Sequence, residues 1–259
     1  MLLAIDIGNT NVVLACAEVG RNLFEDRPPI WRLETDADKN SADYAAAIRD
    51  LLGANRCAAV TGAIVASVVP ALSTVICDAV ASATGHVPLL VGDDGVDLGI
   101  DINIDEPEQA GADRLVNAVG AQAHHQLPAI VLDFGTATTF DVVDADGAYV
   151  GGAIAPGVNL SLQALHEAAA ALPHVDIAKP QRVVGTNTVA CMQSGVFWGY
   201  VGLVREICNR IKAERARPMK VIATGGLAPL FQQTDALFDA IEDTLTMHGL
   251  TVIHNFNIG

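Results

Sequence analysis

The stretch IDIGNTN at residues 5–11 recurs in kind as LDFGTAT at residues 132–138. Each copy has an aspartate between two apolar residues, then a glycine, then small residues that are mostly hydroxyl or amide side chains. Apolar segments flank both copies, at residues 2–5 and 12–15 and again at residues 130–132 and 139–143, so both are predicted to be β-hairpins with a polar, glycine-bearing tip. Since the copies lie nearly half of the 259-residue chain apart, they indicate an internal duplication.

Strands and helices are predicted to alternate after each hairpin. In the first half the pattern predicts strands at residues 31–35, 63–69 and 88–91, and helices at residues 41–52 and 71–84, the second one closed by Gly85. In the second half it predicts a strand at residues 149–154, helices at residues 159–171 and 188–215, a strand at residues 220–223 and a helix after Gly226. Such alternation implies an α/β fold of two domains, residues 1–117 and 118–259, with mixed central sheets and an interdomain cleft.

Composition narrows the class of protein. The chain is 51% hydrophobic and 17% charged, which suits folded domains with proper cores. It has no run of eighteen apolar residues and no charged N-terminal region of a signal peptide, so we expect a soluble cytoplasmic protein with no membrane partner. The five cysteines have irregular spacings and are predicted to be reduced thiols. A formal net charge of −15 repels polyanions and disfavours nucleic acid as a partner.

The two hairpins have the residue types that suit phosphate and metal binding. Glycine lets the backbone approach a phosphate, successive amides form a nest for an anion, and a carboxylate holds a hydrated cation. One hairpin alone is weak support, because Asp and Gly also occupy ordinary turns. Two copies could together clamp the phosphates of a nucleotide from both sides of a cleft.

Basic side chains are missing around both hairpins. No Lys or Arg lies between residues 115 and 178, nor among the first twenty residues. The charge of a bound phosphate must then be met by amides and by metal ions, with Mg²⁺ the expected escort. The GK[ST] signature of a Walker-type loop is absent, which excludes that class of phosphate site.

Two further elements allow both a structural and a functional interpretation. The segment VIATGGL at residues 221–227 fits a nucleotide across a helix start, or equally a tight strand-to-helix turn. The segment GADR at residues 111–114 puts Asp113 and Arg114 at a helix start, where Asp can cap the helix and Arg can pair with it. In a functional interpretation the Asp accepts a proton from an attacking alcohol and the Arg binds a carboxylate.

The predicted helix at residues 188–215 has almost no polar face in its middle, around Trp198. It is therefore expected to be buried, either in the domain core or, by a slight preference, in a homodimer interface. Its interior glycines each lower helix propensity by roughly 1 kcal/mol, which close backbone packing would offset.

Five motifs together resemble the type III pantothenate kinases, and the likeness covers nearly the whole chain. They are DIGNTN at 6–11, GADR at 111–114, DFGTATT at 133–139, GGAIAPG at 151–157, and NT at 187–188 followed by MQSG at 192–195. The resemblance implies the actin-like (ribonuclease H-like, ASKHA) fold of the sugar and acetate kinases. It also implies ATP-dependent phosphorylation of pantothenate at the entry to coenzyme A synthesis, by a homodimer.

The resemblance also implies roles for individual residues. ATP is expected to bind to the first hairpin and to one residue of the second: Asp6, Ile7, Gly8, Asn9, Thr10, Asn11, Val12, Val13 and Thr136. Asp113 matches the catalytic base. Pantothenate is expected to contact Gly111, Ala112, Asp113, Arg114, Thr188 and position 104. Asp133 matches a ligand of a monovalent cation, K⁺ or NH₄⁺, which acts beside the Mg²⁺ that accompanies ATP.

One position departs from the family pattern. Seven residues before Gly111 the family commonly has a tyrosine that lines the pantothenate site, and this chain has Ile104. The departure concerns substrate affinity and leaves the reaction type unchanged. Two alternatives remain open: another small-molecule kinase of the same superfamily, since fold does not fix substrate, and a non-catalytic regulatory relative that binds nucleotide or pantothenate.

Overall fold

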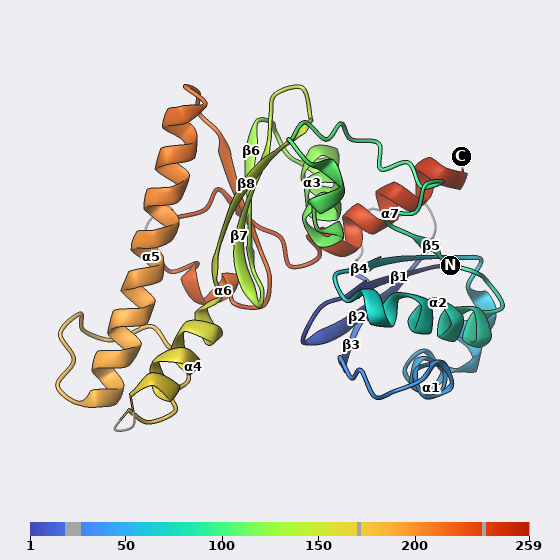
Figure 1. Ribbon diagram of the computed structural model, residues 1–259, viewed down its shortest axis with the longest axis horizontal. Coiled ribbons are helices and arrows are strands. Elements are labelled where there is room, and N and C mark those ends of the chain that lie inside the picture. Colours follow the sequence, from blue (N-terminus) through green and yellow to red (C-terminus); the bar gives the residue numbers. More distant parts are fainter. Residues whose placement is uncertain (19–26, 170–171, 235–236, 259) are drawn as a thin grey trace. The chain divides into compact units, whose positions relative to one another are not determined.

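The computed structural model describes residues 1–18, 27–169, 172–234 and 237–258 (Figure 1). The chain forms two compact units. Unit 1 consists of Met1–His124 together with Thr244–Gly259, and unit 2 is His125–Asp243. Each unit contains one five-stranded mixed sheet and its own helices, so the predicted α/β class is confirmed.

The sheet of unit 1 has the strand order β3-β2-β1-β4-β5. Its strands are β1 (Leu2–Ile7), β2 (Asn11–Ala17), β3 (Ile30–Glu34), β4 (Gly62–Ser67) and β5 (Leu89–Leu90). The central strand β1 runs antiparallel to β2 and parallel to β4. Its first four residues are fully buried, because helices cover both faces of the sheet, and this accounts for the unbroken apolar run LLAI.

Helices α1 (Ser41–Ala59) and α2 (Pro70–Thr84) cover one face of this sheet and share a core with Leu3, Ile5 and Ile7 (Figure 1). α1 starts with a capping box between Asn40 and Asp43, and α2 ends at Gly85, which has the left-handed φ of 79° that glycine tolerates. Helix α1 continues to Ala59 across a kink at Gly53, beyond the predicted end at residue 52.

The other face of the sheet packs against α3 (Ala112–His124) and α7 (Leu245–Ile258). These two helices approach closely through glycines. A Cβ at Gly249 would lie 2.0 Å from the carbonyl oxygen of Val116, and one at Gly120 would lie 2.7 Å from that of Leu245. The short 3₁₀ helix η1 (Pro107–Gln109) precedes α3.

This packing corrects the predicted domain ranges of 1–117 and 118–259. α3 stays with unit 1 to its end at His124, and the C-terminal segment returns to unit 1 because α7 packs on α3. The sequence did not lead us to predict α7 at all.

The sheet of unit 2 repeats the topology of unit 1, with the order β10-β9-β6-β7-β8. Its strands are β6 (Ala129–Phe134), β7 (Ala137–Val143), β8 (Tyr149–Pro156), β9 (Lys220–Thr224) and β10 (Ala240–Ile241). The central strand β6 runs antiparallel to β7 and parallel to β9, as β1 does to β2 and β4. The predicted duplication is therefore present in three dimensions.

Helices α5 (Thr188–Glu214) and α6 (Ala228–Phe231) cover one face of the second sheet (Figure 1). Their core contains Phe134, Phe197 and Phe231, and the rings of Phe134 and Phe231 stack at a centroid distance of 5.0 Å. Helix α4 (Val158–Ala168) begins after β8, and the predicted end of this helix at residue 171 lies outside the described residues.

Within unit 2 the middle of α5 is buried on one side only, which disagrees with the core alternative; burial against a second subunit stays a prediction. Its inner face lies in the core, but Gly195, Gly199 and Gly202 are exposed and Trp198 is 37% exposed. Within the described chain, a Cβ built on any of these three glycines meets no atom within 4 Å. The close backbone packing expected at these glycines is therefore not made inside unit 2.

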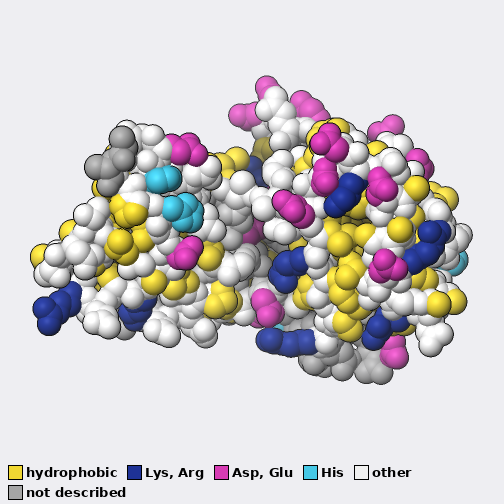
Figure 2. Space-filling view, turned by 90° about the horizontal axis from the view of Figure 1, so that it is seen from below, with side chains coloured by type: hydrophobic (Ala, Val, Ile, Leu, Met, Phe, Trp, Pro, Cys, Tyr) yellow, Lys and Arg dark blue, Asp and Glu magenta, His cyan; other side chains and the backbone are white. Residues whose placement is uncertain are grey.

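No helix among the described residues combines the length and the apolar character that crossing a membrane requires. On the face drawn in Figure 2, Lys and Arg side chains are interspersed with acidic ones and gather in no extended basic patch.

Candidate active site

The first hairpin, β1–β2, presents Asp6 at the end of a buried strand, followed by a tip at residues 8–11. The tip is closed by a hydrogen bond of 2.9 Å from the Gly8 N–H to the Asn11 carbonyl. Thr35, directly after β3, holds it from the side: its N–H donates to the Thr10 carbonyl (3.0 Å) and its hydroxyl donates to the Gly8 carbonyl (2.6 Å). The tip is thus a fixed loop in which Asn9, Thr10 and Asn11 are exposed.

Two residues of the predicted ATP set have side chains that are inaccessible to a ligand. Ile7 and Val12 are 0% and 1% exposed and belong to the core beneath α1 and α2. A nucleotide can therefore meet them only through their backbone amides. Asp6 and Val13 lie opposite each other in the strand pairing and are only partly buried.

Asp113 lies in the first turn of α3, which begins one residue earlier at Ala112. Asp113 is not the N-cap of this helix. The N-cap position belongs to Gly111, whose carbonyl accepts the backbone N–H groups of Arg114 and Leu115. Asp113 Oδ1 instead accepts the Arg114 N–H at 2.8 Å. Burial raises the pKa of the Asp113 carboxyl, and the Arg114 N–H and guanidinium oppose the shift. A carboxylate with a raised pKa is suited to accept a proton.

Unit 1 brings Asp6 and the start of α3 to the same face of its sheet. Side chains alternate along β1, so Asp6 shares a face with Leu2 and Ala4, and these two pack against Val116 of α3. Ile104 is half-buried in the loop that leads from β5 to η1 and on to Gly111. The predicted base, the predicted phosphate hairpin and the departure at position 104 therefore all belong to one compact unit.

The second hairpin, β6–β7, presents Asp133 and an exposed tip residue, Thr136. Glycines surround this tip closely. A Cβ at Gly157 would lie 2.1 Å from the Thr136 carbonyl oxygen, and a Cβ at Gly225 would lie 2.4 Å from Asp133 Oδ1. A side chain at either position would clash with these oxygen atoms and with the neighbouring backbone, so the close approach of the chain around this tip requires glycine at both.

The donor set fits such a cation better than it fits a transition metal. Across the part of the chain that the structure describes, no three His, Cys, Asp or Glu side chains gather in a way that could hold a metal ion. A cation at Asp133 would therefore be held by one carboxylate and by hydroxyl, carbonyl or water oxygens, a ligand set that suits K⁺.

The remaining predicted residues lie at the ends of elements in unit 2. Thr188 is the exposed first residue of α5, after Asn187, whose side chain caps the helix by accepting the Ala190 N–H at 2.9 Å. Gly225 has a φ of 88° and connects β9 to α6. Because α6 has only four residues, its start alone does not decide between a nucleotide contact and a plain turn.

Sequence reasoning missed two features of the hairpins. Thr35 holds the first tip, and no sequence signal pointed to it. Asp141, in the middle of β7, is a fully buried carboxylate that accepts from Thr139 and Tyr149. An Asp in the apolar strand segment FDVV was a signal that could have been followed.

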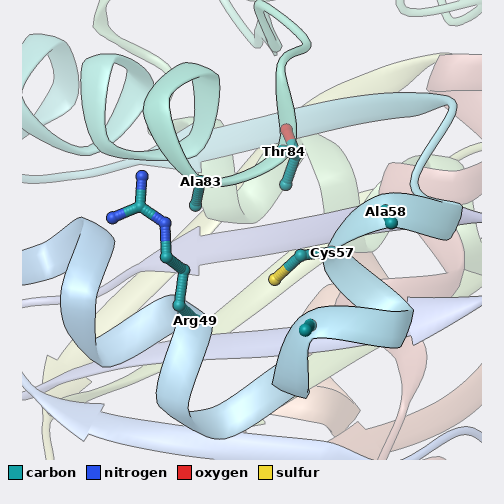
Figure 3. A pocket seen from close by; sticks show the side chains of 6 residues that line it. Arg49, Cys57, Ala58, Ala83 and Thr84 are labelled. Carbon is teal, nitrogen blue, oxygen red and sulfur yellow. The ribbon is translucent and has the colours of Figure 1, made fainter.

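A cavity of about 450 Å³ lies between α1 and α2 (Figure 3). Arg49, Cys57, Ala58, Ala83 and Thr84 line it together with Ala54. The Arg49 guanidinium donates a hydrogen bond of 2.6 Å to the Ser82 carbonyl of α2. None of the lining residues belongs to the predicted site, and the cavity contributes nothing to the chemistry described above.

Comparison with known proteins gives one consistent family. The family model described as "Type III pantothenate kinase" matches residues 2–210. Among curated proteins, the type III pantothenate kinase of Roseobacter denitrificans is 57% identical over 258 residues, covering 99% of this chain and 98% of that protein. The type III pantothenate kinase of Dinoroseobacter shibae is 56% identical over 261 residues, with 99% of both chains covered.

The solved structures show the fold. The inorganic polyphosphate/ATP-glucomannokinase from Arthrobacter sp. strain KM matches with a TM-score of 0.52 at 13% identity, covering 98% of both chains. At that identity the likeness concerns the architecture of two duplicated sheets and says nothing of the substrate.

Proposed function

This chain belongs to the type III pantothenate kinase family, and from that premise we propose how its residues carry out the reaction. The family is that of ATP-dependent kinases that phosphorylate pantothenate for coenzyme A synthesis, and the chain matches its members over almost their whole length. The observation that carries the assignment to residues is the GADR segment at the start of α3, where a desolvated carboxylate stands beside an arginine.

Asp113 acts as the general base. Its carboxylate takes the proton of the pantothenate hydroxyl as the hydroxyl oxygen attacks the γ-phosphorus of ATP, and ADP leaves with the electrons of the broken P–O bond. The raised pKa of Asp113 makes its carboxylate a stronger proton acceptor than a solvated one. Arg114 supplies a guanidinium for the substrate carboxylate.

ATP binds through the first hairpin. Its tip at residues 8–11 is held by hydrogen bonds in which the Gly8 N–H is already engaged, so the phosphates would meet the other amides of the tip, and Asp6 at its base holds the divalent metal that accompanies ATP. Thr136, exposed at the tip of the second hairpin, adds a contact.

Asp133 holds a monovalent cation, K⁺ or NH₄⁺. When bound, this ion supplies positive charge beside the phosphates, in a stretch of chain with no Lys or Arg between residues 115 and 178. Gly225 brings the turn after β9 close to Asp133 Oδ1, so backbone oxygens of that turn lie within reach of an ion at this carboxylate.

Pantothenate contacts Thr188 and Ile104 besides the segment at residues 111–114. Both are accessible: Thr188 is exposed and Ile104 is half-buried. An isoleucine keeps apolar contact with the dimethyl part of pantothenate and offers no hydroxyl.

The active form is a homodimer that uses the outer face of α5. This face has no side chains at three positions, Gly195, Gly199 and Gly202. The partly exposed Trp198 lies next to Gly199 in the sequence. Such a face permits close approach of a second helix. Light scattering on the full chain measures the mass, and a monomer at assay concentrations would contradict the assignment. The cytoplasmic location stays a prediction from the sequence.

The test of function is direct. Purified protein is incubated with pantothenate, ATP, Mg²⁺ and K⁺, and 4′-phosphopantothenate is sought by mass spectrometry. A reaction without pantothenate serves as the control for ATP hydrolysis alone. Absence of product in a folded, nucleotide-binding protein would favour the non-catalytic relative.

A further inference from the structure

Asp141 is a fully buried carboxylate in the middle of β7, and the mechanism above gives it no role. Its Oδ2 accepts a hydrogen bond of 2.8 Å from the Thr139 hydroxyl. Its Oδ1 accepts one of 3.1 Å from the hydroxyl of Tyr149, which is itself 1% exposed. Burying a carboxylate is costly even when it is hydrogen-bonded, so its presence in this strand calls for a reason.

The three residues Asp133, Thr139 and Asp141 lie on one face of the second sheet. In the antiparallel pairing of β6 with β7, Asp133 is opposite Thr139. Phe134 and Phe140, their neighbours in sequence, lie in the core beneath α5, and alternation along a strand puts Asp133, Thr139 and Asp141 on the other face. Directly opposed residues have their Cβ atoms about 4.5 to 5.5 Å apart. Thr139 therefore lies between the two carboxylates.

The hydroxyl of Thr139 has a single proton, and it donates that proton to Asp141. Toward Asp133 it can offer only lone pairs. An ionised carboxylate also offers only lone pairs. A cation that binds beside Asp133 and Thr139 would therefore be coordinated by one carboxylate, that of Asp133, and by one neutral oxygen, the Thr139 hydroxyl.

The first hairpin is an internal control for a purely structural explanation. There Asp6 is opposite Val13, and the next residue on the same face of β2 is Ala15. Val13 and Ala15 pack in the apolar cluster between the sheet and the helices α3 and α7. The same strand framework thus forms without a hydroxyl and a buried carboxylate, so the fold does not require them.

We propose that Thr139 Oγ1 is a further ligand of the monovalent cation at Asp133, and that Asp141, held by Tyr149, is the positioning residue that turns the lone pairs of Thr139 toward the ion. The inference rests on the monovalent cation assigned to Asp133 under the proposed function. One carboxylate with neutral oxygens suits a large, weakly hydrated ion, so K⁺ is the ligand expected to respond.

The experiment measures ion binding apart from turnover. The full chain, with Mg²⁺ and a non-hydrolysable ATP analogue, is titrated with KCl at constant ionic strength against tetramethylammonium chloride. The melting temperature reports the titration, and NMR of thallium(I), a K⁺ substitute, reports binding directly. Thr139→Val should raise the K⁺ concentration at the midpoint about tenfold or more, as loss of an inner or outer ligand of a metal commonly does. Thr139→Ser keeps the oxygen and should titrate close to the native protein.

Thr138→Val is the matched control, because it makes the same chemical change one residue away on the core face. Thr138 is 0% exposed, and its hydroxyl has no hydrogen-bond partner within the described structure, so valine should fit there. It should leave the K⁺ midpoint unchanged. Asp141→Asn, which keeps the side-chain size, should shift the midpoint in the same direction as Thr139→Val.

The outcomes separate the two proposals. A merely structural role predicts a lower melting temperature in both salts with an unchanged K⁺ midpoint, and that result would overturn the inference. An equal shift in Thr138→Val, or a native protein that does not respond to K⁺ or thallium(I), would overturn it as well. A failure to phosphorylate pantothenate would leave these binding results untouched and would count against the proposed function alone.

Discussion

The hairpins β1–β2 and β6–β7 share a strand framework and differ in the residues that face their aspartates. Both central strands pair antiparallel with the next strand and parallel with a later one. Asp6 is paired with Val13, whereas Asp133 is paired with Thr139. The Thr139 hydroxyl in turn donates to Asp141. The tips differ too, since residues 8–11 separate the paired strands in the first hairpin and residues 135–137 do so in the second. One duplicated scaffold therefore presents two different sets of side chains, for which we propose the metal–phosphate group and a monovalent cation as ligands.

The largest expected effect comes from a residue of unit 1 that has no assigned counterpart in unit 2. Asp113→Asn should lower kcat by about 10²- to 10⁴-fold while nucleotide binding persists, because general-base catalysis commonly contributes that much. In the native enzyme, kcat/KM should fall as pH drops through the raised pKa of Asp113, since the base must be ionised. A folded Asp113→Asn enzyme with near-normal turnover would remove Asp113 from the mechanism.

Stability provides a second measurement on the same variant. Because the folded-state pKa of Asp113 is raised, the folded protein holds this proton more tightly than the unfolded chain does. This group's contribution to stability therefore falls as pH rises through the raised pKa, and the ionised carboxylate is a cost at neutral pH. Asp113→Asn should melt no lower than the native protein at pH 7.

The paired variants Asp6→Asn and Asp133→Asn test the division between the two hairpins. Asp133→Asn should lower activity about 10- to 100-fold and abolish the difference between K⁺ and tetramethylammonium, because it removes the charged ligand of the ion. Asp6→Asn should keep that difference and lose affinity for Mg·ATP instead. Each variant is the control for the other, and identical ion profiles in the two would show that the hairpins are not specialised.

A smaller effect is expected at Ile104, which lies in the long connection from β5 to α3. The connection from β10 to α7, which follows the corresponding strand of the second sheet, is short. Many residues connect β5 to α3, whereas β10 ends at Ile241 and α7 begins at Leu245. Ile104→Tyr restores a hydroxyl that can meet the substrate, worth about 0.5 to 1.5 kcal/mol for a neutral hydrogen bond. KM for pantothenate, measured at saturating ATP and K⁺, should fall with little change in kcat. An unchanged or higher KM would put Ile104 outside the pocket.

The smallest effect concerns how the two tips are held. Thr35 donates its hydroxyl to Gly8 in the first hairpin, whereas Gly157 follows β8 at the corresponding point of the second. Thr35→Val should lower the free energy of unfolding by about 0.5 to 1.5 kcal/mol, the net value of one hydrogen bond. Denaturant unfolding measures it, with Thr74→Val, the same change at an exposed position of α2, as the control. Equal losses in both variants would show that the Thr35 bond contributes nothing special.

Much of the fold was predictable because its signals are local. Apolar segments that flank glycine-bearing tips predicted both hairpins, and a long apolar pattern predicted α5 to within a residue. Helix α7 was missed because Gly249 lies in its middle and counts locally as a helix breaker. That glycine is explained only by the Val116 carbonyl, which lies beside it in the folded chain.

Candidate site residues could be picked out from the sequence only where a single segment carries them. Asp6, Asp113 and Asp133 each stand at an element boundary, so a motif could point to them. Asp141 lies inside a strand, and its importance depends on the register that puts Thr139 opposite Asp133. Register is a property of strand pairing, and alternation within one strand does not determine it.

The return of α7 to unit 1 has a consequence for the order of folding during synthesis. Unit 2 is one continuous stretch of chain, whereas unit 1 is completed by residues that follow it. On a ribosome, unit 2 has all of its strands before α7 emerges, and until then the α3 face of unit 1 lacks the helix that covers it. Domains generally fold as the chain emerges, N-terminal part first, but unit 1 is completed only by residues that come after unit 2. The covering of the α3 face of unit 1 therefore waits for residues that follow the whole of unit 2.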